Sequence, residues 1–148
     1  MIASGNYAPA PRFVWPGGKR CAAMLCFDVD GETTALSEDA GLAHRRSIMS
    51  QCEYGPRIGV PRLLGLLDHL TVPATFFIPG YIAERHPRMP LAVADRGHEI
   101  GLHSYLHEKL NHVNEAEETA ILERSFSVLE KLGDHPAGGH VHHGRQRE

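Results

Sequence analysis

Two pairs of residues of the types that bind metal ions stand far apart in the chain. Asp28 and Asp30 are separated by one residue, and His103 and His107 by three. Two histidines at this spacing would lie on one side of a helical turn, where one metal ion can bind both. Two carboxylates directly after an apolar run are costly in a core and well suited to a site. A divalent metal site is therefore expected if the fold brings the two pairs together.

Each pair also has a plainer interpretation. In a chain with 11 histidines, a pair at this spacing also arises by chance, as one partly buried and one surface residue. The aspartate pair with the following Gly31 is also a favourable turn sequence, because Asp and Gly are common in turns. Placement favours the site, because each pair follows an apolar segment that is expected to be a strand.

Three segments have the composition of buried strands. Each is short, and the first is almost continuously apolar, which is typical of strands in a parallel sheet. They are residues 21–27, 74–78 and 98–102. The first of them is expected to be buried on both faces.

Helices are expected between and after these strands. Apolar stripes predict helices at 59–70 and 115–132. Residues 81–96 predict one or two short helices broken by their two internal prolines. Residues 33–54 show no clean period, which predicts a long loop or a loop with one short helix around residues 43–50.

This order of strands and helices predicts an α/β fold with parallel pairing and right-handed crossovers. The carboxyl ends of parallel strands meet at one edge of the sheet. We therefore expect Asp28, Asp30, His103 and His107 to gather at that edge.

Composition limits the classes of protein. A chain of 148 residues with 42% hydrophobic and 22% charged residues can form one globular core. The net charge of -3 and the scattered basic residues argue against nucleic acid as a partner. No apolar run is long enough to span a membrane and the first residues do not resemble an export signal, so a cytoplasmic location is expected. Cys21, Cys26 and Cys52 suggest neither a disulfide framework nor a zinc knuckle, and are expected to be small core residues.

Three ordered motifs carry a resemblance to a known family. They are Phe27–Glu32 (FDVDGE), Ala74–Gly80 (ATFFIPG) and Gly97–Glu108 (GHEIGLHSYLHE). They resemble the polysaccharide deacetylases, carbohydrate esterase family 4 with its NodB homology domain, over roughly residues 15–132. The Asp-Val-Asp form is similar to the branch that includes allantoinase-like and cyclic-imide hydrolases.

The resemblance implies a fold, a reaction and residue roles. The fold is a distorted (β/α) barrel of about seven strands. The reaction is hydrolysis of a non-peptide carbon–nitrogen bond in an N-acetylated sugar or a small cyclic amide. Asp28 corresponds to the general base, and Asp30, His103 and His107 to the ligands of one divalent metal ion. Zinc is expected first, although ligand type also permits Mn, Fe or Co.

Glu53, Tyr54 and Arg57 precede the helix at 59–70 and are candidate substrate-binding residues. Their sequence is equally that of a plain turn.

The likeness fails after residue 138. The arginine that orients the base in this family, and the histidine that serves as general acid, have no counterpart in the polar, His-rich residues 139–148. We therefore expect an irregular arm at 1–20, part of a barrel at 21–138, apparently truncated, and a disordered tail at 139–148. Open strand edges would favour self-association or exchange of elements with a second copy.

Three functions stay open on this basis. The first is an active amide hydrolase. The second is a catalytically impaired, metal-binding fragment of such an enzyme. The third is a non-catalytic structural or interaction module, which would leave the convergence of four ligand-type residues unexplained.

Overall fold

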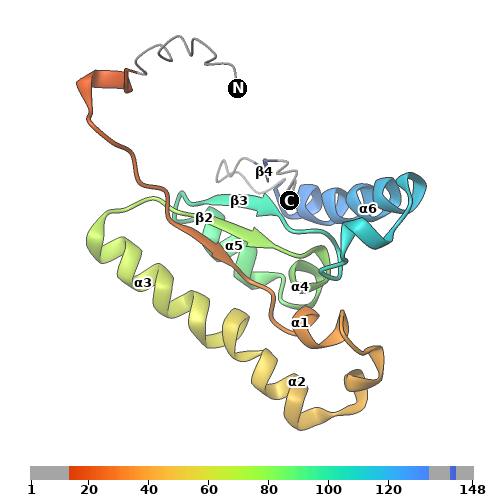
Figure 1. The fold of residues 1–148 in the computed structure, drawn as a ribbon. Coiled ribbons are helices and arrows are strands. Elements are labelled where there is room, and N and C mark those ends of the chain that lie inside the picture. Colours follow the sequence, from red (N-terminus) through yellow and green to blue (C-terminus); the bar gives the residue numbers. More distant parts are fainter. Residues whose placement is uncertain (1–13, 134–140, 143–148) are drawn as a thin grey trace, which may run out of the picture.

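Four parallel strands form a single sheet in the computed structural model, which describes residues 14–133 and 141–142 (Figure 1). The strands are β1 (Cys26–Asp28), β2 (Thr75–Ile78), β3 (Glu99–Leu102) and β4 (Val141–His142), in that spatial order. The α-helices are α1 (Thr33–Leu36), α2 (Arg46–Cys52), α3 (Val60–Leu70), α4 (Gly80–Arg85), α5 (Arg88–Ala94) and α6 (Glu115–Gly133). The predicted α/β class with parallel pairing is confirmed.

Short helical turns complete the described part of the chain. Three are 3-10 helices, at Pro16–Gly18, Ala40–His44 and Leu110–His112, and one is a π-helix at Gly55–Gly59, between α2 and α3. None of the helices in the described ranges is both long and apolar enough to cross a membrane.

One face of the sheet lies in the core, and the described residues leave the other face exposed or half-buried. Figure 1 shows α3, α4 and α5 on the same side of the sheet. Alternate strand residues pack there against apolar side chains of α3 to α6. These strand residues are Phe76, Ile78, Ile100 and Leu102, and Val29, directly after β1, packs with them. Residues of the opposite face stay exposed or half-buried, namely Cys26, Asp28, Thr75, Phe77 and Glu99.

The first strand differs from its prediction. A strand buried on both faces was expected at residues 21–27, but β1 begins at Cys26 and residues 21–25 are irregular and exposed. The physical reason is that β1 lies at an edge of the sheet and the described residues cover only one of its faces. The expectation that all three cysteines are core residues is also wrong. Cys21 and Cys26 are exposed, and Cys52 is half-buried.

The helices were predicted with mixed success. The helices expected at 59–70 and 115–132 are confirmed as α3 and α6. Pro87 separates α4 from α5, but Pro90 lies in the first turn of α5, where the missing N–H is tolerated. The segment 33–54 is more regular than expected, because it contains α1 and a 3-10 helix as well as α2.

The ends of the chain lie partly outside the described residues. Val141 and His142 form β4 and pair with Ile100 and Gly101 of β3, whereas no strand was expected there. The remainder of the predicted tail and the arm before residue 14 are outside the described residues. The proposed limits of the arm, domain and tail therefore stay predictions.

Candidate metal centre

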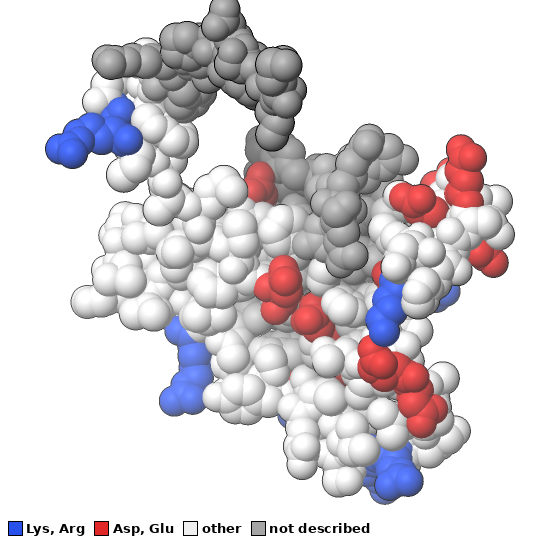
Figure 2. All heavy atoms as spheres, in the orientation of Figure 1, with Lys and Arg blue, Asp and Glu red and all other residues white. Residues whose placement is uncertain are grey.

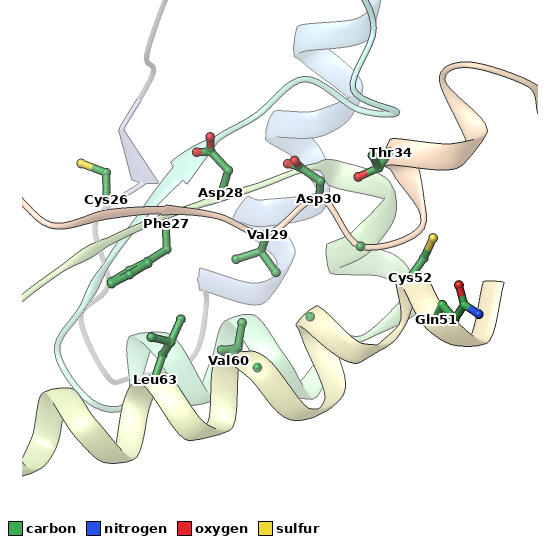
Figure 3. A pocket seen from close by; sticks show the side chains of 13 residues that line it. Cys26, Phe27, Asp28, Val29, Asp30, Thr34, Gln51, Cys52, Val60 and Leu63 are labelled. Atoms are coloured by element: carbon green, nitrogen blue, oxygen red, sulfur yellow. The ribbon is translucent and has the colours of Figure 1, made fainter. Parts of the chain in front are cut away.

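The carboxyl ends of β1 and β3 bring the two predicted pairs together. Asp28 ends β1 and Asp30 follows two residues later, while His103 directly follows β3. Figure 3 shows the Asp28 and Asp30 carboxylates on one side of their segment and Phe27 and Val29 on the other. The alternation of a strand thus sends the apolar residues to the core and the carboxylates to the site.

Asp30, His103 and His107 form a cluster that could hold one metal ion. One ligand atom of each residue lies within 4.8 Å of the other two. Nε2 of His103 is 3.3 Å from Oδ1 of Asp30, and Nε2 of His107 is 4.0 Å from Oδ2. The two imidazole rings meet edge to face, with centroids 4.9 Å apart. Within the described residues, this is the one cluster of three or more His, Cys, Asp or Glu groups at this spacing.

The two histidines do not sit on a helix, contrary to the prediction from their spacing. They flank a turn at residues 104–106, and Ser104 and His107 both have φ of 60°, in the left-handed region. This conformation is costly for residues other than glycine. A spacing of three residues between two ligands is therefore compatible with either a helix or a turn, and here tertiary contacts select the turn.

Glu108 holds this turn in place, and the sequence reasoning missed it. Its carboxylate accepts hydrogen bonds from the backbone N–H groups of Tyr105 and Leu106, at 3.1 and 2.8 Å, and from the hydroxyl of Ser104. The Ser104 hydroxyl oxygen in turn accepts a bond from the N–H of Glu108, at 3.1 Å. A serine and a glutamate four residues apart, each adjacent to a candidate histidine ligand, are the sequence signal for this arrangement.

A second short turn positions Asp30. The carbonyl oxygen of Asp30 accepts hydrogen bonds from the N–H and the hydroxyl of Thr33, at 2.9 and 2.7 Å. Gly31 has φ of +51°, and a Cβ there would lie 2.9 Å from the side chain of Ile82. This position therefore needs glycine both for its conformation and for its close contact with α4.

Electrostatic coupling ties Asp30 to His103. The close contact with His103 lowers the pKa of Asp30, with further lowering by the charges of both histidines, while partial burial opposes the shift. The same contact raises the pKa of His103, against the effect of its burial, and the charges of Asp30 and Asp28 add to the increase. The site therefore attracts a positive charge to a place between these side chains.

The residues present fit a metal ion. Oδ1 of Asp30 is buried and, among the described residues, has no hydrogen-bond partner, because its 3.3 Å contact with His103 lacks hydrogen-bond geometry. A cation would satisfy this oxygen. One carboxylate and two imidazoles match zinc ligation and leave coordination positions for water and substrate. The same donors also suit other divalent transition metals.

Asp28 lies beside this cluster without belonging to it. Its side chain is exposed, and its charge contributes to the raised pKa of His103. Figure 2 shows acidic side chains gathered where β1 ends and over α1 and α6, while basic side chains on this face are scattered.

An open pocket of about 630 Å³ adjoins the two aspartates (Figure 3). It lies between the β1 segment and the helices α2 and α3. Its lining residues are Cys26, Phe27, Asp28, Val29, Asp30, Gly31, Thr34, Gln51, Cys52, Gly55, Gly59, Val60 and Leu63. Apart from the two aspartates these residues are uncharged, so the pocket suits a neutral, partly apolar ligand.

The three candidate substrate-binding residues do not line this pocket. The carboxylate of Glu53 forms ion pairs with Arg57, at 2.9 Å, and with Arg85, at 3.2 Å. The hydroxyl of Tyr54 accepts a hydrogen bond from Arg62, and the side chains of Tyr54 and Arg57 are mostly exposed. The structure thus places all three beside the pocket, and their role in binding substrate stays a prediction.

The chain matches the family model described as polysaccharide deacetylase over residues 41–141, more than half of its length, and it belongs to that family. The match includes both histidines and begins after the two aspartates. A peptidoglycan deacetylase-like protein of Gibberella zeae is 36% identical over 101 residues, which are 64% of this chain and 30% of that protein. A peptidoglycan deacetylase of Helicobacter pylori is 34% identical over 86 residues, which are 57% of this chain and 29% of that protein.

Solved structures give the same fold. A candidate polysaccharide deacetylase from Mycobacterium smegmatis superposes with a TM-score of 0.81 at 48% identity, over 86% of this chain and 44% of that one. An allantoinase superposes with a TM-score of 0.70 at 29% identity, over 90% of this chain and 49% of that one. The chain spans about 30% of the curated relatives and under half of these structures, so it contains part of the family's distorted barrel.

Proposed function

We propose that this chain belongs to a metal-dependent hydrolase of non-peptide carbon–nitrogen bonds. The observation that carries the proposal is the convergence of Asp30, His103 and His107, with a buried carboxylate oxygen that has no hydrogen-bond partner in the described part of the chain. The deacetylase family and the adjoining pocket support the same reaction class.

Each residue of the site would have a distinct part in the reaction. Asp30, His103 and His107 would hold a zinc ion, or another divalent metal, which when bound lowers the pKa of water and polarises a carbonyl group. Asp28 lies next to the cluster, is exposed, and would accept the proton of the attacking water as general base. The pocket along β1, α2 and α3 would orient the amide beside these groups.

The substrate would be an N-acetylated sugar or a small cyclic amide. Relatives named as peptidoglycan deacetylases support the first class, and the likeness to an allantoinase supports the second. The mainly uncharged pocket lining is compatible with both.

A metal-content measurement with matched variants tests the metal site. Purified, tag-free protein should contain or take up about one equivalent of zinc, and Asp30→Asn and His107→Ala should lose it. His112→Ala removes an exposed histidine outside the cluster and should keep the metal. Absence of zinc uptake by the unmodified protein would refute the proposal.

Activity assays then separate an active enzyme from a metal-binding remnant. N-acetylglucosamine oligomers, allantoin and cyclic imides are the substrates to test first. Asp28→Asn should abolish hydrolysis while the bound metal is retained, because Asp28 is not a ligand. Full metal occupancy without hydrolysis of any of these amides would favour the catalytically impaired alternative.

A further inference from the structure

Glu32 is a fully buried carboxylate two residues after the ligand Asp30. Its side chain is 0% exposed, and Nε of Arg85 donates to its Oε1 at 2.5 Å. Nε2 of His86 lies 3.0 and 3.2 Å from its two oxygens. A buried carboxylate is costly unless it is paired and hydrogen-bonded, so these contacts fix the aspartate loop against the carboxyl end of α4.

The amino end of the same helix holds the histidine turn. The N–H of Gly80 donates to the carbonyl oxygen of Ser104 at 3.0 Å, and the N–H of Tyr81 donates to that of Tyr105 at 2.9 Å. A Cβ at Gly80 would lie 2.8 Å from the ring of Tyr105, so the turn and the helix are in close contact. These two N–H groups belong to the first turn of a helix and have no partners within it.

Helix α4 itself is firmly anchored. Ile82 and Ala83 in its middle are 0% exposed and belong to the core. Strand β2 lies between β1 and β3, so pairing within the sheet does not join the two ligand loops directly. The six-residue helix is thus a rigid connection between the loop that carries Asp30 and the turn that carries both histidines.

We propose that Glu32 and Arg85 are positioning residues for the metal ligands, acting through α4. Their contact sets the distance between Asp30 and the His103–His107 pair, and so determines how tightly a metal ion is bound. The inference rests on the proposed function, since it assigns the support of that same metal site. Arg85 also donates to Glu53 at 3.2 Å, which extends this support to the end of α2.

Zinc affinity of matched variants is the first measurement. Glu32→Gln keeps the size of the side chain and removes the charge that pairs with Arg85. We expect zinc affinity, measured by competition with a chelator, to fall by about 10- to 100-fold, as is typical when support of metal ligands is lost. Asp68→Asn is the control, because it also breaks a carboxylate–arginine pair, that of Asp68 with Arg96 at 3.0 Å, in an exposed place outside the two ligand loops. It should leave zinc affinity unchanged.

Hydrogen exchange in metal-free protein is the second measurement and does not need a bound ion. The amides of Tyr105 and Leu106 should exchange faster in Glu32→Gln than in the unmodified protein, and at the original rate in Asp68→Asn. Arg85→Lys keeps the charge and changes the geometry of a partly exposed side chain, so it serves if Glu32→Gln does not fold.

The outcomes distinguish this inference from the proposed function. Zinc affinity and amide exchange that change no more in Glu32→Gln or Arg85→Lys than in Asp68→Asn would overturn the positioning role while leaving the metal site intact. If the unmodified protein binds no zinc, the proposed function fails. Faster exchange confined to the Glu32 and Arg85 variants would then still support the mechanical link through α4.

Discussion

Replacing Glu108 by alanine should loosen the turn that carries both histidine ligands. Its carboxylate accepts hydrogen bonds from Ser104, Tyr105 and Leu106. Without it, these three donors lose their common acceptor, and the turn is no longer held in its present conformation.

The expected loss of zinc affinity in Glu108→Ala follows from two quantities, the backbone strain in the turn and the hydrogen bonds that offset this strain. Left-handed φ values at Ser104 and His107 cost on the order of 1–2 kcal/mol each. Hydrogen bonds to a charged acceptor contribute about 1.5–3 kcal/mol each when they are buried, and the partly buried Glu108 belongs at the lower end. Three such bonds are enough to offset the strain, and their loss would let the turn relax. Zinc affinity should then fall by roughly 10- to 100-fold, the usual effect of losing support for metal ligands.

Chelator competition with zinc, together with thermal unfolding of the metal-free protein, measures this effect. Glu117→Ala is the matched control, because the Glu117 carboxylate also accepts a backbone N–H, from Asn114 at 2.9 Å, but at the exposed start of α6. Glu108→Gln keeps an uncharged acceptor and should lie between alanine and the unmodified protein. Equal zinc affinities in the Glu108→Ala and Glu117→Ala proteins would refute the reasoning.

Three further results are expected. Gly101→Ala would place a Cβ 2.4 Å from the ring of Phe77, so the free energy of unfolding, measured with denaturant, should fall by about 1–3 kcal/mol. A second substitution, Phe77→Leu, should recover part of this loss. An unchanged unfolding midpoint in Gly101→Ala would contradict this packing. Gly80→Ala would bring a Cβ within 3.1 Å of a backbone atom of α6, so both the melting temperature and zinc affinity should fall, and an effect on neither would contradict the contact. In metal-free protein, the interaction of Asp30 with His103 should stabilise the fold fully between pH 3.8 and 6.5, the ordinary pKa values of the two groups. This stabilisation should be lost as pH rises through the raised pKa of His103. It should also be lost as pH falls through the lowered pKa of Asp30. The stability difference between the unmodified protein and Asp30→Asn, followed across pH, measures this, and a difference that grows above 6.5 would contradict the assigned direction.

The parallel sheet and the ligand cluster were predictable from local patterns. Short apolar runs indicate strands, and an alternating order of strands and helices brings their carboxyl ends to one edge. Asp30, His103 and His107 therefore converge as expected. Burial was harder to predict, because the composition of residues 21–27 cannot tell whether another layer covers the second face of the sheet.

The support of the site could not be predicted, because it depends on contacts distant in sequence. Glu32 was visible in the motif, but its partner Arg85 is 53 residues away. Glu53 was expected to face substrate, and its pairing with Arg85 depends on the same fold. Likewise, the spacing of His103 and His107 does not distinguish a helix from a turn with left-handed residues.

The alternation in Figure 3 makes the site sensitive to the length of one short segment. Phe27 and Val29 face the helices, while Asp28 and Asp30 face the histidines, so core packing and chemistry depend on the same pairing of β1 with β2. A shift of this pairing by one position, as an insertion or deletion of one residue within β1 could cause, would exchange the two sets. Both carboxylates would then enter an apolar core and two hydrophobic side chains would face the metal ligands. Insertions or deletions of one residue within β1 should therefore be far more damaging than the same changes in the exposed segment that precedes it.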